Sequence, residues 1–232
     1  MVMNRIDKKS LLLSSTSVLA ALVFISVAIE ITSLDQALAD WIYQWEGNQW
    51  HLKNEWITAV LIHKGGKYFS IALLLAVVLL LLLSCISPML AMWKHRLQYL
   101  LAATISGSLI VSVGKVITNI SCPWDFSRYG GTQEYLPLIE QLWVRNGSQC
   151  FPAGHASAGF AWVALYFVGR HSLSSWRWPA LFFALFLGTV FGISQQLRGA
   201  HFLSHDIWSF GTCWMVSLIC YEVMLKPYES TK

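Results

Sequence analysis

The sequence predicts an all-helical integral membrane protein, a bundle of six transmembrane helices that forms one domain over residues 1–232. The chain of 232 residues is 56% hydrophobic and only 12% charged, with a mean hydropathy of +0.53, whereas soluble domains carry about 25% charged residues. Several apolar runs approach the roughly 20 residues that a helix needs to cross a bilayer. Lys and Arg gather in short segments between these runs, as they do in cytoplasmic loops.

The spans are expected at residues 11–31, 68–90, 97–118, 153–169, 178–195 and 207–225. Arg5, Lys8 and Lys9 precede the first run, which favours a cytoplasmic N-terminus; a signal peptide cleaved near residues 37–39 is the alternative. Residues 34–67 mix charges with tryptophans, which predicts an interfacial helical segment between the first two spans.

With this topology the basic loops and both termini lie on the cytoplasmic side, and two polar segments, 119–155 and 195–206, lie together on the outer side. Four ionisable residues stand at the span ends there: Lys115, His155, Arg198 and His201. Ionisable groups at such positions are costly and indicate function. Cations, a nucleophile and an acid are what cleavage of a phosphate ester requires. Basic runs interleaved with aromatic residues are absent from the sequence, which argues against nucleic acid as a partner.

The turn at residues 152–155 opens the fourth span. Gly154 allows the backbone to approach a ligand, and the helix N-terminus offers N–H groups to an anion. His155 then follows in the first turn, beside that anion. The alternative is an ordinary turn with an interfacial histidine.

The segment 195–206 carries the second group of candidates. In a helix, Arg198, His201 and His205 share one face. The guanidinium of Arg198 suits phosphate oxygens, and neutral His201 suits attack on phosphorus. Either His205 or Asp206 would then hold the His201 tautomer. A polar cap that anchors two span ends is the alternative.

Two further cations are candidates for the same anion. Lys115 lies at the outer end of the third span, where it either binds phosphate or extends to water. Arg128 lies in the polar loop, where it either reaches the anion or stays solvated.

The three polar segments resemble the motifs of the type 2 phosphatidate phosphatase and vanadium haloperoxidase superfamily, over about residues 97–225. The family patterns are Lys-x6-Arg-Pro, Pro-Ser-Gly-His and Ser-Arg-x5-His-x3-Asp. This chain has Lys115-x6-Cys122-Pro123, Pro152-Ala153-Gly154-His155 and Ser194-Gln195-x5-His201-x3-His205. The order of the motifs, after spans three, four and five, is that of the membrane branch.

The chain departs from these motifs at four positions: Cys122, Ala153, Gln195 and His205 stand where the family has Arg, Ser, Arg and Asp. Arg198, one turn after residue 195, and Arg128 are candidates to replace the lost guanidinium groups. The resemblance implies His201 as nucleophile, His155 as general acid and His205 as the residue that orients His201. It implies phosphate binding by Lys115, Gly154 and Arg198, a phosphohistidine intermediate, and no metal or other cofactor.

Cys122 and Cys150 stand at the two ends of the polar loop, on the expected outer side. An oxidising compartment would permit a disulfide between them, and two free thiols are the alternative. The lack of tight ligand spacing argues against a zinc site.

We therefore expect a lipid phosphatase that hydrolyses a lipid phosphate or diphosphate at the outer face of a bacterial inner membrane. The alternatives are a lipid-to-lipid phosphotransferase and a non-catalytic membrane binding or transport protein with a degenerate site. Its expected partners are the lipid substrate and membrane lipids; the sequence does not identify a protein partner.

Overall fold

The structure, a computed structural model, describes residues 8–145, 147–172 and 174–227, and Arg5 lies outside them. The described residues are helical, without strands, as expected. The α-helices are α1 (Lys8–Ile31), α2 (Leu34–Trp45), α3 (Gly66–Ile86), α4 (Pro88–Ala91), α5 (Lys94–Thr118), α6 (Leu138–Val144), α7 (Gly154–Phe160), α8 (Ala164–His171), α9 (Arg177–Leu197) and α10 (Leu203–Cys220). Short 3-10 helices are η1 (His51–Lys53), η3 (Pro123–Asp125), η4 (Ser127–Tyr129) and η5 (Ala161–Val163), and η2 (Trp56–Gly65) and η6 (Tyr221–Leu225) are π-helices.

The prediction of six spans is not confirmed. Among the described residues, four helices are long and apolar enough to cross a membrane: His51–Ile86, Lys94–Asp125, Arg177–Leu197 and Leu203–Leu225. A fifth span arises if α1 and α2, which are bent by 58° at their junction, count as one. The expected fourth span is divided among α7, η5 and α8, because the backbone tightens to a 3-10 helix at Ala161–Val163.

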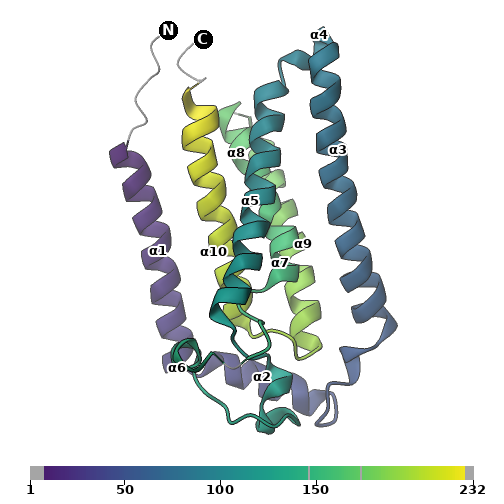
Figure 1. Ribbon diagram of the computed structural model, residues 1–232, viewed down its shortest axis with the longest axis vertical. Helices are drawn as coiled ribbons and strands as arrows, with labels where there is room; N and C mark the ends of the chain where they lie inside the picture. Colours follow the sequence, from purple (N-terminus) through teal and green to yellow (C-terminus); the bar gives the residue numbers. More distant parts are fainter. Residues whose placement is uncertain (1–7, 146, 173, 228–232) are drawn as a thin grey trace.

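The segment between the first two spans also differs from its prediction. Helix α2 does lie across one end of the bundle (Figure 1). The second long helix, however, already begins at Trp56 as a π-helix that runs into α3. This part contacts α9, and the Ser194 hydroxyl donates to the carbonyl of Thr58 at 3.4 Å. Residues 56–67 are therefore part of the bundle rather than an interfacial segment.

The two ends of the bundle differ in chemistry. The start of α1, the α4–α5 turn and the α8–α9 turn lie at one end, with the end of α10 beside them (Figure 1). The basic residues Lys94, His95, Arg96, Arg170 and Arg177 belong to these turns. The polar loop 119–153 and helices α2 and α6 lie at the opposite end. This separation is the one that the sequence predicts.

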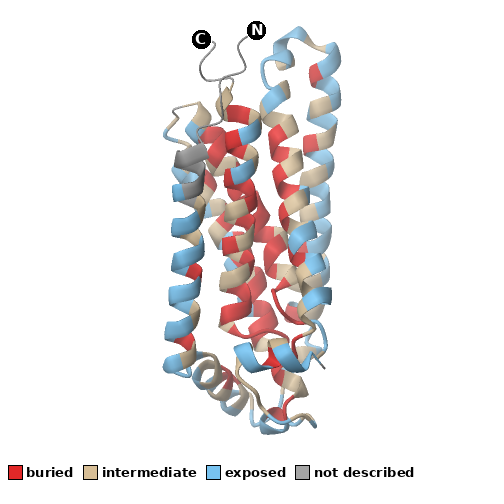
Figure 2. Cartoon of the chain, turned by 60° about the vertical axis from the view of Figure 1, so that its left-hand side comes forward, coloured by how far each residue is buried: buried red, intermediate tan, exposed pale blue. Residues whose placement is uncertain are grey.

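The core lies among α5, α7, α9 and α10, whereas α1 and α3 are largely exposed (Figure 2). Tyr99 of α5 and Phe167 of α8 are fully buried, and the Tyr99 hydroxyl donates to the carbonyl of Ser217 at 3.1 Å. The exposed side chains of α3 are mostly apolar, and a bilayer would cover them. The packed helices therefore fix the positions of the ends of α5, α7 and α9, where the candidate site lies.

Candidate active site

A partly open cavity of about 770 Å³ lies among α3, α5, α7 and the end of α9. Its polar wall contains three cationic side chains and three imidazoles, from Lys67, Lys115, Arg198, His63, His155 and His201. The lining residues include no Asp or Glu. Cations grouped in a cavity without neighbouring carboxylates favour a multiply charged anion. Towards the middle of the bundle the wall becomes apolar, with Ile71, Leu74, Ile105 and Leu109.

Lys115 and Gly154 lie against each other in this cavity. Helix α5 ends three residues after Lys115, where Asn119 takes a left-handed conformation. A Cβ atom at position 154 would stand 3.2 Å from Cδ and 3.4 Å from Nζ of Lys115. Glycine therefore leaves room for the lysine to cross the start of α7 and place its ammonium group in the cavity.

His155, in the first turn of α7, is held on both sides. Its Nε2 lies 3.4 Å from the carbonyl oxygen of Ile62, and because a carbonyl only accepts, Nε2 donates. The ring packs between those of His63 and Phe191, with centroid distances of 4.5 and 4.8 Å. Nδ1 is therefore the ring nitrogen left for a ligand.

The condition under which Arg198, His201 and His205 would share one helix face is not met. Helix α9 ends at Leu197, and α10 begins only at Leu203. Gly199 has a φ of +70°, and a Cβ atom there would lie 2.4 Å from the ring of Trp50. The glycine turn ends α9 in the way that helix C-termini commonly do. Arg198 and His201 nevertheless both reach the cavity, from the turn rather than from one helix face.

His201 is paired with His205. Their Nδ1 atoms lie 3.4 Å apart, so that one donates to the other, and His205 is fully buried. Burial lowers the pKa of His201 well below that of a free histidine, with His205 and Lys115 adding to the effect. A neutral His201 that donates from Nδ1 keeps a lone pair on Nε2, the form that nucleophilic attack requires. His205 thus occupies the place that the sequence assigns to an orienting residue.

Asp206 is not brought to the cavity. Its Oδ2 accepts a hydrogen bond from Nε2 of Gln196 at 2.6 Å, and it lines a separate, mostly apolar cavity beside α2. Of the two candidate partners that the sequence left open, His205 is the one whose ring contacts His201, whereas Asp206 contacts Gln196. Asp206 is one residue further along α10, and a step of one residue turns a helix by about 100°.

Arg128 is not brought to the cavity either. Its Nε and Nη2 donate to the two carboxylate oxygens of Asp40 at 2.7 and 2.6 Å. These bonds raise the pKa of Arg128. The pair is partly exposed and ties the polar loop to α2. The structure therefore gives Arg128 an anchoring contact in place of the phosphate contact expected from the sequence.

Arg198 is fixed by two hydrogen bonds at the cavity wall. Its Nε donates to the carbonyl of Lys53 at 2.8 Å, and its Nη1 donates to Oε1 of Gln195 at 3.1 Å. Burial lowers the pKa of Arg198, although a guanidinium stays charged in proteins. Gln195 Nε2 in turn lies 3.2 Å from Nδ1 of His63.

His63 is a site residue that sequence reasoning missed. It lies outside the three motifs, in the segment read as interfacial, and reaches Gln195 across 132 residues of sequence. One histidine and two lysines in the run His63-Lys64-Gly65-Gly66-Lys67 carry no periodic signal. Only the packing of η2 against α9 brings His63 to the cavity.

Cys122 and Cys150 form a disulfide, with a Cα–Cα distance of 5.2 Å. Both cysteines line the cavity, so the bond closes the polar loop over it. Among the residues that the structure describes, no three His, Cys, Asp or Glu side chains converge as a metal site requires.

The fold and the cavity define a helical membrane-type protein with a cationic, histidine-lined site. The chain belongs to the PAP2 superfamily, whose family model matches residues 96–229. This confirms the resemblance drawn from the three motifs and supports phosphatase-type chemistry on phosphoesters. Neither the comparison with curated proteins nor that with solved structures returned a match.

Proposed function

We propose that the protein hydrolyses a lipid phosphate or diphosphate. The observation that carries this proposal is the composition of one cavity: three cations and three imidazoles at one end, and apolar side chains of α3 and α5 at the other. A lipid phosphate has two matching parts, a charged head group and an apolar hydrocarbon chain. The apolar wall would hold the start of the chain while the cations hold the phosphate oxygens.

In the proposed mechanism, His201 attacks phosphorus through Nε2 while its Nδ1 proton is held by His205. The bond from phosphorus to the leaving oxygen breaks, and protonated His155 gives that oxygen a proton from Nδ1, since Nε2 is bound to Ile62. Water then attacks the phosphohistidine. His155 takes a proton from this water, and inorganic phosphate leaves.

The anion contacts are proposed from the same geometry. Lys115 and Arg198 would bind the equatorial phosphate oxygens, and Gly154 would let the lysine reach them. Charge stabilisation of this kind is often the largest single contribution to phosphoryl transfer.

The membrane arrangement is also part of the proposal. We place the basic turns on the cytoplasmic side and the cavity at the outer face, where the disulfide is stable. Helices α7, η5 and α8 would together form the fourth span in chain order, and α1 with α2 the first, which brings the total to six. A bacterial inner membrane, with both termini in the cytoplasm, fits this arrangement.

The test is phosphate release by the detergent-purified full chain from a panel of phosphatidate, phosphatidylglycerol phosphate, polyprenyl diphosphate and lipid A. We expect release from at least one lipid and its loss in His201→Ala. Full activity of His201→Ala would refute the mechanism, and no turnover of any lipid would refute the function.

The same assay separates the alternatives. A phosphorylated acceptor lipid in place of free phosphate would identify a phosphotransferase. Lipid binding without any turnover would identify a non-catalytic protein. Acid-labile labelling of the wild type, absent from His201→Ala, would detect the phosphohistidine directly.

A further inference from the structure

Position 195 lacks the guanidinium that the third family motif supplies. Gln195 is buried, uncharged and placed at the cavity wall. Its amide contacts two other side chains that line the cavity, Arg198 on one side and His63 on the other. The glutamine therefore serves as a connector between two groups that reach the ligand space.

The hydrogen-bond directions in this chain follow from donor chemistry. A guanidinium only donates, so the oxygen of the Gln195 amide faces Arg198 and its nitrogen faces His63. The amide nitrogen donates, so Nδ1 of His63 accepts. A neutral His63 must then carry its proton on Nε2. The ring nitrogen that remains available is thus a hydrogen-bond donor.

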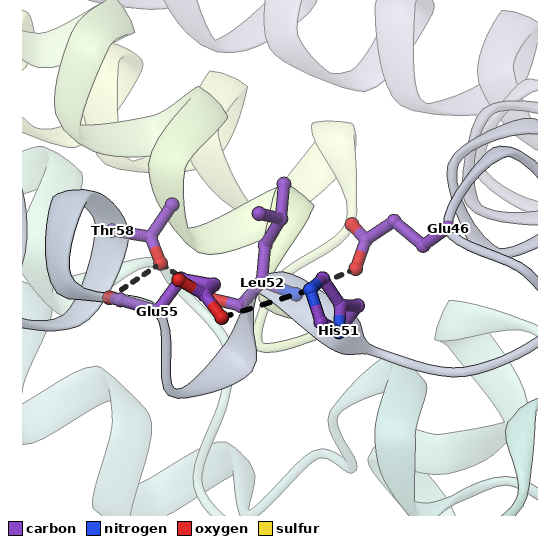
Figure 3. Close-up of polar contacts among 5 residues, drawn as sticks. All are labelled: Glu46, His51, Leu52, Glu55 and Thr58. Carbon is purple, nitrogen blue, oxygen red and sulfur yellow. Dashed lines mark hydrogen bonds and ion pairs between the residues drawn. The ribbon is translucent and has the colours of Figure 1, made fainter.

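The segment that carries His63 is firmly held. Figure 3 shows the turn before η2, in which the carboxylate of Glu46 accepts from the backbone N–H of Leu52 at 2.8 Å. The hydroxyl of Thr58 donates to the carbonyl of Leu52 in the same view. The carbonyl of Thr58 in turn accepts from the hydroxyl of Ser194 at 3.4 Å. These contacts join η2 to the end of α9, so the position of His63 is set before a ligand arrives.

We propose that His63 is a phosphate-binding residue, and that His63 and Arg198, joined by Gln195, together replace the arginine of the third motif. The His63 Nε2–H and the Arg198 guanidinium would each donate to a phosphate oxygen from opposite sides of the amide. The ring of His63 also packs against that of His155, with the ring planes tilted by 43°, and would thereby help to position the proposed general acid. This inference rests on the proposed function. It adds a phosphate-binding residue that lies outside residues 96–229, the range that the family model matches.

Two substitutions of His63 distinguish direct phosphate binding from a purely structural role. In His63→Gln, the side-chain amide nitrogen reaches the place of Nε2, so a donor to the ligand is retained while the acceptor for Gln195 is lost. In His63→Asn, the shorter side chain reaches only the place of Nδ1, so the bond to Gln195 is retained and the donor to the ligand is lost. A purely structural role predicts that Asn is tolerated better than Gln.

The probe is orthovanadate, a phosphate analogue, and its Kd is measured on the detergent-purified full chain from the shift in melting temperature. Each variant is compared with its own melting temperature without vanadate, so a general loss of stability does not hide the result. We expect the Kd of His63→Asn to rise about 10- to 100-fold, the value of one hydrogen bond to a charged group. We expect His63→Gln to stay within a few-fold of wild type.

His51 supplies the matched control, because it lies in the same segment, is exposed and pairs with Glu55 outside the cavity (Figure 3). His51→Asn and His51→Gln should leave the vanadate Kd unchanged. Equal losses in the two His63 variants, a wild-type Kd in His63→Asn, or a better Kd for Asn than for Gln would each overturn the inference. Vanadate binding needs no turnover, so this result is distinct from failure of the lipid assay.

Discussion

The contact between His201 and His205 predicts how activity responds when position 205 is changed to aspartate. In the proposed mechanism the ring of His201 gains positive charge as it attacks phosphorus, and a neutral His205 would offer it a hydrogen bond without opposite charge. At an effective dielectric constant of about 20, opposite charges about 4 Å apart attract by roughly 4 kcal/mol. Desolvation of the buried carboxylate offsets much of this. A net gain of about 1–2 kcal/mol remains, so His205→Asp should raise kcat roughly tenfold.

His205→Ala is the opposite change. It removes the hydrogen bond that holds the His201 tautomer, worth about 1.5–3 kcal/mol when one partner becomes charged, and should lower kcat roughly 10- to 100-fold. Both variants are assayed by the single-turnover rate of phosphate release, with melting temperatures to control for the lost packing against Phe151 and Phe202. A wild-type rate in His205→Ala, or a His205→Asp rate no higher than that of His205→Ala, would refute an orienting role for residue 205.

Three other predictions follow from the site. Gly154→Ala places a methyl group 3.2 Å from Cδ of Lys115, and displacement of the ammonium should raise the vanadate Kd about tenfold at an unchanged melting temperature; an unchanged Kd would contradict the contact. Arg128→Ala should leave the vanadate Kd unchanged and cost only about 0–1 kcal/mol in a melting assay, because its partner is the partly exposed Asp40; a large rise in Kd would restore its phosphate role. Because burial lowers the pKa of His201, the ring stays neutral below pH 6.5, so the acid limb of kcat/KM should lie below the ordinary histidine value of about 6.5; a midpoint at or above 6.5 would contradict this.

Much of the helical framework could be predicted from apolar run length and basic loops. The helices at residues 94–118, 177–197 and 203–225 begin and end close to their expected limits. The ordered motifs also brought Lys115, Gly154 and His155 to one cavity, as expected from their positions at span ends. These features depend on local sequence, which is why sequence reasoning reaches them.

The remaining features depend on contacts between distant segments. His63 reaches the cavity only because η2 packs on α9, and the partner of Arg128 lies 88 residues away. The break after Leu197 did have a local signal, because a glycine soon after a helical run commonly ends a helix. The i, i+3, i+7 pattern of Arg198, His201 and His205 outweighed that signal in the sequence reading.

The disulfide between Cys122 and Cys150 has a consequence for biogenesis. Thiols stay reduced in the cytosol and pair only where the environment is oxidising. With the cavity at the proposed outer face and both cysteines in its wall, the pocket would take its final form only after the loop has been translocated. A newly made chain would thus remain unfinished while it faces the lipids of the compartment in which it is synthesised.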